Sequence, residues 1–246
     1  VSNVINNYTE HAIRHNSKTI HDKQAELAAL QSQINPHFLY NTLDCIRGQA
    51  LIENNNSIAV MVEALGNLFR YSISRKGELV TLRDELANVQ NYMMIQRYRF
   101  DNRFSLQINV KSEDEISYEC SIPKLIIQPI IENAIYHGLK EKLEGGIVSI
   151  EVTLFHHNLI LLISDNGEGM EPEVLSELNK NIRSNSKFFD HYNHNSSKNT
   201  GIALANIHKR LQLLFGEKYG LQVFSTLNQG TDVEILLPAR FERETG

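Results

Sequence analysis

The sequence predicts an α+β fold in which a helical hairpin precedes a mixed sheet that is covered on one face by helices. Two amphipathic helix patterns separated by a short turn occupy residues 31–78. Strand patterns dominate the chain after residue 104, and long helix patterns lie between them. We therefore expect a helical unit followed by a two-layer unit of helices on a sheet.

The composition is that of a globular protein with a real core. Of the 246 residues, 41% are hydrophobic and 22% are charged, which is enough for one large or two modest domains. The net charge of -5, with both signs interspersed, leaves no basic surface of the kind that binds phosphate backbones. We therefore expect no nucleic-acid partner.

The cysteines and the chain start bear on the cellular setting. Cys45 and Cys120 lie far apart and follow no CxxC spacing, which predicts two buried thiols in a reducing compartment. No stretch approaches the ~20 consecutive apolar residues that cross a bilayer. Because the chain begins with Val1 instead of Met, we expect a fragment whose membrane or sensor region lies upstream.

Residues 1–30 are predicted to form a signalling helix. Ile13, Ile20, Leu27 and Ile34 recur every seven residues, as in one seam of a coiled coil. The second apolar position of each heptad is mostly polar, so this coiled coil would be marginal. A solvated helix that packs on its own domain is the alternative.

Residues 31–78 are predicted to form the hairpin. Pro36 cannot donate to the carbonyl four residues earlier, so it kinks a helix or starts a new one with Asn35 as its cap. The segment ENNNS at 53–57 predicts the turn. The apolar positions of the two helices are Leu39, Leu43, Ile46 and Ala50, then Ile58, Met61, Val62, Leu65, Leu68 and Phe69. A lone hairpin leaves these faces half exposed, which favours a four-helix homodimer.

A connecting helix is predicted within residues 79–103, opened by Thr81 with Asp84 and Glu85 and continuing through Tyr98. Residues 104–246 would form the α/β unit. Its expected strands are 104–110, 148–155, 159–164, 221–226 and 232–238, and its expected helices are 123–139 and 201–215. Residues 171–199 are rich in Asn, Ser and Lys with little apolar periodicity, which predicts a long mobile loop.

Polar residues gather in the helix over 123–139 and after the strand that ends near Asp165. Asn133 and His137 lie one turn apart, so they share a helix face. Asp165 ends a buried strand, and Gly167 and Gly169 follow, which let the backbone approach a ligand closely.

Two further stretches complete this pattern. Gly201 directly precedes a predicted helix, whose free N–H groups suit a phosphate. Gly230 and Thr231 lie at a hairpin. Each stretch alone is ordinary, since an Asp-x-Gly-x-Gly sequence is often only a turn. Their order and their helix and strand contexts together point to one ligand site.

The sequence resembles the sensor histidine kinases of the YesM/LytS type from about Gln24 to Ala239. The segment LQSQINPHFLYNTLD is similar to the phosphoacceptor box of that family, and IPKLIIQPIIENAIYHG to its N-box. SDNGEGM and TGIALANIHKRL are similar to its two glycine boxes. Residues 1–23 resemble the end of a HAMP-type relay helix. The resemblance implies a GHKL-type α/β sandwich that binds ATP, in the cytoplasmic portion of a plasma-membrane receptor.

The resemblance also implies residue roles and a reaction. His37 would accept a phosphoryl group from ATP and pass it to an aspartate on a response regulator. Asn133 would be catalytic and hold Mg²⁺ through its amide oxygen. Asp165 would accept a hydrogen bond from the adenine amine. The remaining nucleotide-binding residues would be His137, Gly167, Gly169, Gly201 and Thr231.

Three departures from the family pattern leave alternatives open. Phe38 follows His37 in place of a carboxylate, Ala203 replaces a glycine of the second box, and Tyr136 replaces a basic residue. A nucleotide-binding pseudokinase or dimeric adaptor is the main alternative. A GHKL ATPase is disfavoured because Pro129 stands where such enzymes carry the water-activating glutamate.

Overall fold

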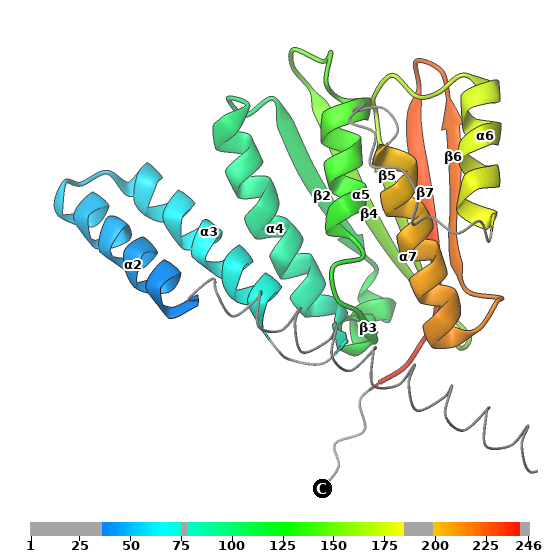
Figure 1. The fold of residues 1–246 in the computed structure, drawn as a ribbon, viewed down its shortest axis with the longest axis horizontal. Coiled ribbons are helices and arrows are strands. Elements are labelled where there is room, and N and C mark those ends of the chain that lie inside the picture. The colour runs from blue at the N-terminus through cyan, green and yellow to red at the C-terminus, as the bar shows by residue number, and fades with distance from the viewer. Residues whose placement is uncertain (1–35, 75–77, 185–198, 242–246) are drawn as a thin grey trace, which may run out of the picture.

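The computed structural model describes residues 36–74, 78–184 and 199–241. Within these ranges, a layer of helices covers one face of a five-stranded sheet, and a helical hairpin extends the helical layer (Figure 1). This confirms the α+β class. The predicted signalling helix over 1–30 and the cap at Asn35 lie outside the described residues. None of the described helices is long and apolar enough to cross a membrane.

The hairpin consists of α2 (Pro36–Ile52) and α3 (Asn56–Ile73). Asn55 caps α3 because its side chain accepts the N–H of Ile58 at 3.3 Å. α2 packs on α3, and the buried residues of the two helices are the small side chains Ala50, Ala59, Val62 and Ala64. Cys45 is exposed on α2, so the expectation of two buried thiols is wrong for this residue, while Cys120 is buried.

The connecting segment contains a short strand before its helix. β1 (Leu79–Thr81) pairs antiparallel with β3 (Ser121–Pro123), and α4 (Leu82–Arg99) follows. The hydroxyl of Thr81 accepts the N–H of Asp84 at 3.2 Å, which confirms the predicted start of the helix. A 3₁₀ segment over Ser112–Glu119, which the sequence did not predict, leads into β3.

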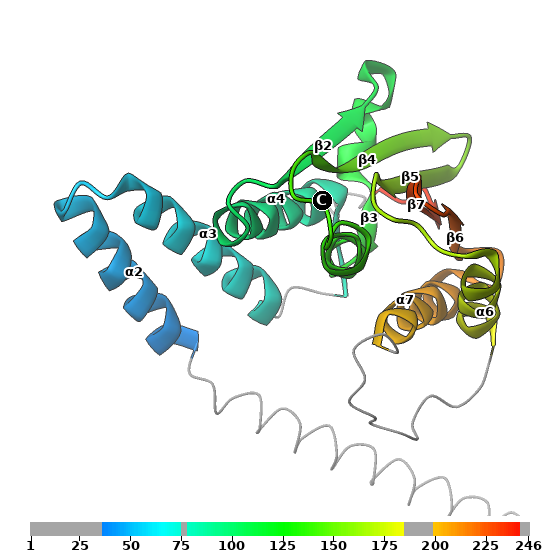
Figure 2. The ribbon, with the colours of Figure 1, turned by 90° about the horizontal axis from the view of Figure 1, so that it is seen from above.

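The sheet has the strand order β2-β4-β5-β7-β6. β2 is parallel to β4, and the other neighbouring strands are antiparallel. The strands are β2 (Phe104–Val110), β4 (Gly146–Phe155), β5 (Asn158–Asp165), β6 (Gly220–Thr226) and β7 (Gly230–Pro238). All lie where the sequence predicts them, with ends that differ by up to two residues. Seen from above, the helices lie on one side of this sheet (Figure 2).

Alternate side chains of the central strands form the core. Ile150, Leu161 and Ile163 are among the core residues buried to 2% exposure or less, as expected for strand positions on the face that the helices cover. Burying each such side chain contributes about 1.5–3 kcal/mol. The opposite strand positions are more exposed, so the sheet is packed on one face.

The helix predicted over 123–139 is wrong in its first part. β3 ends at Pro123, α5 (Gln128–Asn133) begins only five residues later, and a π-helix over Ala134–Gly138 follows. Leu125 has a left-handed φ of 60°, which breaks the helical path. The N–H groups at 125–127 donate to a side chain of α4, which fixes this turn from outside the segment.

The long loop predicted over 171–199 is also wrong in its first part. α6 (Pro172–Arg183) occupies it, with Pro172 in the first turn. Leu175, Leu178 and Ile182 recur at helical spacing and face the core. Residues 185–198 lie outside the described residues. α7 (Asn199–Phe215) begins two residues earlier than predicted, so Gly201 lies inside its first turn.

Candidate functional site

An open pocket of about 570 Å³, counted with the space at its mouth, lies between the helical layer and the sheet. Its walls are mostly apolar, and a few polar groups converge on it, which is the usual character of a small-molecule site. The apolar side chains are Ile130, Ile163, Met170, Leu204, Val223 and Val233. The polar side chains are Asn133, His137, Ser164, Asp165 and Thr231. Five predicted residues, Asn133, His137, Asp165, Gly169 and Thr231, are therefore brought together.

Asp165 is the acidic group of the pocket. It ends β5 opposite Thr231 of β7, and its Oδ1 accepts the N–H of Gly167 at 2.8 Å. Burial raises the pKa of Asp165 from 3.8 to about 6, against hydrogen bonds from Gly167 and Thr231 that lower it, while the charge of Asp232 adds to the rise. A hydrogen-bond acceptor is thus held at a fixed point among apolar walls.

Two glycines allow the backbone to close around Asp165. A Cβ on Gly167 would lie 2.2 Å from the carbonyl oxygen of Gly138, and a Cβ on Gly138 would lie 2.7 Å from Oδ1 of Asp165. Gly167 does not line the pocket itself but orients the carboxylate. Gly138 was missed by the sequence analysis. Gly138 directly follows His137 at the end of a helix, and this position could have indicated that it belongs to the site.

The glycines of the neighbouring turns are required for the same reason. Gly169 has a φ of +66°, and a Cβ there would meet the carbonyl oxygen of Thr226 at 2.0 Å. Gly230 has a φ of +116°, and a Cβ there would lie 1.9 Å from the carbonyl oxygen of Asp165. The hydroxyl of Thr231 lies 3.0 Å from that of Ser225. The strand ends therefore pack backbone to backbone at the pocket floor.

Asn133 and His137 come from α5 and the π-helix after it, and both line the pocket as their spacing predicts. Nδ2 of Asn133 is buried without a hydrogen-bond partner among the described residues. Oxygen and nitrogen of an amide are assigned from their surroundings, so either atom can face the pocket. Burial, followed by the charge of Lys140, lowers the pKa of His137. The orphaned amide marks the place where a ligand would complete the site.

Gly201 does not line the pocket. It lies in the first turn of α7, where a Cβ would be 3.4 Å from Cδ1 of Leu178. Leu204, almost one turn later, does line the pocket. The start of α7 is thus near the site, although the glycine itself is not in contact with it.

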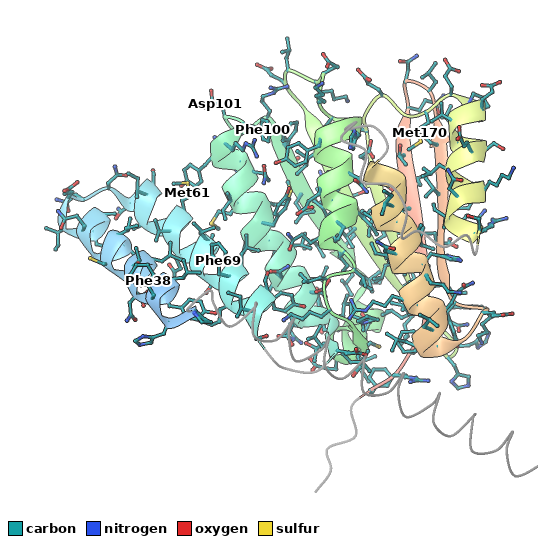
Figure 3. The ribbon with its side chains drawn as sticks, viewed as in Figure 1. Phe38, Met61, Phe69, Phe100, Asp101 and Met170 are labelled. Atoms are coloured by element: carbon teal, nitrogen blue, oxygen red, sulfur yellow. The ribbon has the colours of Figure 1, made fainter. Side chains whose placement is uncertain are left out.

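His37 is exposed in the first turn of α2, far from these residues in the fold. Nδ2 of Asn41, one helical turn later, lies 3.3 Å from its Nδ1, so the two side chains interact. Met170 lines the pocket, and Figure 3 shows it and Phe38, the residue after His37, on opposite sides of α4. Among the described residues, none from α2 or α3 lines the pocket.

A cation that the sequence analysis missed contacts Tyr136, the residue before His137. Nη1 of Arg99, at the end of α4, donates to the hydroxyl of Tyr136 at 2.6 Å, and its guanidinium lies over that ring. Arg99 therefore places a positive charge beside Tyr136, which stands where the family pattern has a basic residue. Only the packing of α4 on α5 brings the two together, so no local sequence signal was available.

Comparisons with known proteins agree with this arrangement. The model of the Histidine kinase family matches residues 25–104, and that of the Histidine kinase-, DNA gyrase B-, and HSP90-like ATPase family matches residues 122–240. The chain is 38% identical to the sensor histidine kinase YesM of Bacillus subtilis, over 89% of this chain and 34% of that protein. The chain belongs to the YesM/LytS-type sensor histidine kinases.

Further relatives of this family give similar figures. The sensor protein LytS of Oceanobacillus iheyensis is 34% identical, over 89% of this chain and 35% of that protein. The chain thus spans about a third of the length of these relatives.

Among solved structures, the histidine kinase domain from the Erythrobacter litoralis EL346 blue-light activated histidine kinase is 14% identical, with a TM-score of 0.45, covering 87% of this chain and 90% of that chain.

Membership of the family identifies the kind of domain that holds the pocket. The pocket lies within the residues matched by the ATPase family, so its domain is of the ATP-binding type. His37 lies within the residues matched by the histidine kinase family.

Proposed function

We propose that the chain is the phosphorylating part of a sensor histidine kinase in a two-component system. Its pocket binds Mg·ATP, the γ-phosphoryl group passes to His37, and then to an aspartate of a response regulator. One observation carries the proposal. A half-buried acceptor, Asp165, and an orphaned amide, Asn133, share an otherwise apolar pocket, while an exposed histidine lies on a separate hairpin.

The pocket floor suits adenine. The Asp165 carboxylate would accept a hydrogen bond from the exocyclic amine, and the Thr231 hydroxyl would support it directly or through water. The apolar walls would cover the ring faces. Gly167 and Gly169 would let the backbone pass close to the base. Guanine presents a carbonyl oxygen at the position of that amine, so ATP should be preferred to GTP.

The Asn133 side of the pocket suits the phosphates. An amide oxygen is a hard ligand, and Mg²⁺ is commonly held by one or two protein groups together with phosphate oxygens and water. The orphaned amide of Asn133 fits that role. A bound Mg²⁺ would neutralise phosphate charge. His137 at the pocket edge and the first turn of α7 at Gly201 would face the same end of the nucleotide.

His37 would act as the nucleophile. A neutral imidazole nitrogen attacks the γ-phosphorus, the bond to the bridging oxygen of ADP breaks, and the proton of the ring nitrogen leaves. The N–P bond formed on His37 breaks in the second step, when a regulator aspartate takes the phosphoryl group. Asn41 contacts the ring and can set its orientation.

The domains follow from these roles. We propose a signalling helix over 1–30, a dimerisation and phosphotransfer hairpin over 31–78, a connecting helix over 79–103 and a catalytic domain over 104–246. Ile46 and Ile58 are exposed to 45% and 40% in the single chain, although they belong to the predicted apolar faces. A homodimer would cover them. By its likeness to sensor kinases, the chain would be cytoplasmic, next to the plasma membrane.

The test is incubation with γ-labelled ATP followed by mapping of the label. We expect an acid-labile, base-stable label on His37. A nucleotide-binding adaptor would bind ATP without any label, and an ATPase would release phosphate without a labelled intermediate. Either result, or a label mapped to another residue, would contradict the proposal.

A further inference from the structure

The π-helix after α5 carries a cation that comes from another helix. α4 and α5 lie side by side (Figure 1), and Nη1 of Arg99, at the end of α4, donates to the hydroxyl of Tyr136 at 2.6 Å. The guanidinium carbon lies 5.6 Å from the centre of the Tyr136 ring. Phe100 packs edge-on against the same ring, with 6.2 Å between the ring centres. Arg99 is therefore held in one place although it is exposed.

The charge of Arg99 is not neutralised by any carboxylate of the described residues. The two ion pairs found among those residues lie on the hairpin and at the start of α4. Glu132, the carboxylate next to Asn133, accepts from Nε2 of Gln128 at 2.9 Å instead. A guanidinium has five N–H donors, and Tyr136 takes one of them. The remaining donors of Arg99 are suited to an anion.

Two other arginines of the α/β unit are already occupied by the backbone. Arg103 donates to carbonyl oxygens of the loop that follows the π-helix, at residues 140 and 142. Arg210 of α7 donates to the carbonyl oxygens of residues 78 and 124. These two guanidinium groups stabilise loops of the fold, whereas Arg99 makes no hydrogen bond to the backbone within the described residues.

Arg99 lies on the Asn133 side of the pocket. Tyr136 follows Asn133 by three residues, so their Cβ atoms are neighbours on the helix surface, about 5–6 Å apart. Helical side chains lean towards the N-terminus, so the Tyr136 ring reaches back over the turn that carries Asn133. Burial, followed by the charges of Glu132 and Tyr136, raises the pKa of Tyr92, which places these groups close together. The guanidinium is thus next to the residue that we assign to Mg²⁺.

We propose that Arg99 binds the phosphate chain of ATP, so that α4 supplies the cation that the N-box of this chain lacks. The inference rests on the proposed function and adds a binding residue to it. Tyr136 is a positioning residue, because its ring and hydroxyl hold the guanidinium. The planar guanidinium can then form paired hydrogen bonds to phosphate oxygens. A residue 37 positions earlier in the chain thereby compensates for the missing basic side chain at Tyr136.

The test is Arg99→Gln in the full 246-residue chain, with calorimetric titration of Mg·ATP, Mg·ADP and adenosine. Because the lost contact is between charged groups at an exposed site, we expect the Kd for both phosphorylated nucleotides to rise about three- to tenfold. The Kd for adenosine should not change, because adenosine has no phosphate. Equal weakening for adenosine would show that Arg99 supports the shape of the pocket and would overturn the inference. Unchanged affinity for ATP would overturn it as well.

The matched control is Arg97→Gln, the same change two residues earlier on α4. Nε of Arg97 donates to the side chain of Asn102 at 3.3 Å, away from Tyr136. The Kd for ATP should stay at the wild-type value. Weakening as large as that of Arg99→Gln would show that any positive charge on α4 has this effect, which would contradict a specific contact.

A double variant separates charge from packing. Arg99→Gln combined with Tyr136→Lys restores a positive charge at the position where the family pattern has a basic residue. ATP should bind more tightly to the double variant than to Arg99→Gln, with the affinity for adenosine unchanged. An affinity for ATP no better than that of Arg99→Gln, in a protein whose thermal unfolding is cooperative, would overturn the inference.

The wild type separates failure of this inference from failure of the proposed function. If the wild type binds ATP and is labelled on His37 while Arg99→Gln keeps the same Kd for ATP, only the role of Arg99 is wrong. If the wild type binds no ATP, the proposed function is wrong and the role of Arg99 falls with it.

Discussion

The nucleotide pocket and the phosphoacceptor hairpin are held in opposite ways. In the pocket, α5, β5 and β7 approach so closely that Gly138, Gly167 and Gly230 leave no space for a Cβ, and Asp165 is fixed by backbone donors. On the hairpin, His37 is exposed and contacts Asn41 of its own helix. Packing of several elements thus fixes the shape of the pocket, whereas the hairpin exposes the His37 side chain to solvent.

This difference indicates how the two regions divide the work. Recognition of a nucleotide needs fixed donors, acceptors and walls, so small changes in the pocket should be costly. A phosphoacceptor needs only to be reached, so the helix around His37 can tolerate changes that leave the imidazole in place. Substitutions that make the same chemical change in both regions should therefore give very different results.

The largest effect is expected from Asp165→Asn. The change removes a half-buried charged acceptor, and losing a hydrogen bond to such a group costs roughly 1.5–3 kcal/mol. The Kd for ATP should rise about ten- to over a hundredfold, measured by isothermal titration calorimetry. Asp232→Asn, the same change at an exposed neighbour on β7, is the control and should alter the Kd by no more than a few-fold. Normal affinity in Asp165→Asn would contradict the adenine assignment.

The next effect is expected from Gly138→Ala. The added Cβ would lie 2.7 Å from Oδ1 of Asp165, so the carboxylate or the π-helix must shift. Overpacking of this kind costs about 1–3 kcal/mol. Thermal unfolding should show a lower free energy of unfolding, and ATP should bind more weakly. A variant with wild-type stability and affinity would show that the close approach at Asp165 is unimportant.

A smaller effect is expected from pH. Because burial raises the pKa of Asp165 to about 6, the carboxylate takes up a proton as the pH falls below that value. ATP affinity should weaken between pH 7 and pH 5, by at most about tenfold per pH unit below the pKa. Phosphate groups also titrate in this range, and His137 is a second titratable group of the pocket, so the difference between the wild type and Asp165→Asn isolates this carboxylate. Identical pH profiles for the two proteins would contradict its role.

The raised pKa of Asp165 also determines how its contribution to the free energy of unfolding changes with pH. The folded pKa of about 6 lies above the ordinary value of 3.8, so the folded state binds more protons between these values. The contribution of Asp165 to the free energy of unfolding is therefore favourable at low pH and is lost as the pH rises from about 4 to about 6.

The smallest effect is expected from Gly48→Ala on the hairpin. No heavy atom lies within 4 Å of the Cβ that this change would add in α2. Alanine in a helix interior is favoured over glycine by roughly 0.5–1 kcal/mol, so the free energy of unfolding should rise slightly. Labelling of His37 should be unchanged. A loss of stability as large as that of Gly138→Ala would show that the hairpin is as tightly constrained as the pocket.

The sequence was sufficient for most of the sheet and for the polar groups of the pocket. Alternating or continuous apolar runs located β2, β4, β5, β6 and β7, because burial on one or both faces imposes those patterns. The sequence also predicted three polar residues of the pocket, Asn133, His137 and Asp165. Helical spacing and a position at a strand end determine where such side chains point, so local geometry was enough to place them together.

The features that the sequence did not predict depend on distant partners. Residues 125–127 were expected to be helical, but their N–H groups donate to Glu85, about forty residues earlier in the chain. The short helix α6 was hidden by a polar composition and only a few apolar positions. Gly138 and Arg99 matter through packing across elements, which no local pattern records.

The central claim is that the pocket is complete without the phosphoacceptor. His37→Gln tests it most directly, because it removes the nucleophile and touches no residue that lines the pocket. With γ-labelled ATP, we expect no label on this variant, together with a Kd for ATP within a few-fold of the wild type by calorimetry. Persistent labelling of His37→Gln would show that another residue accepts the phosphoryl group, and a large loss of ATP affinity would contradict the independence of the two sites.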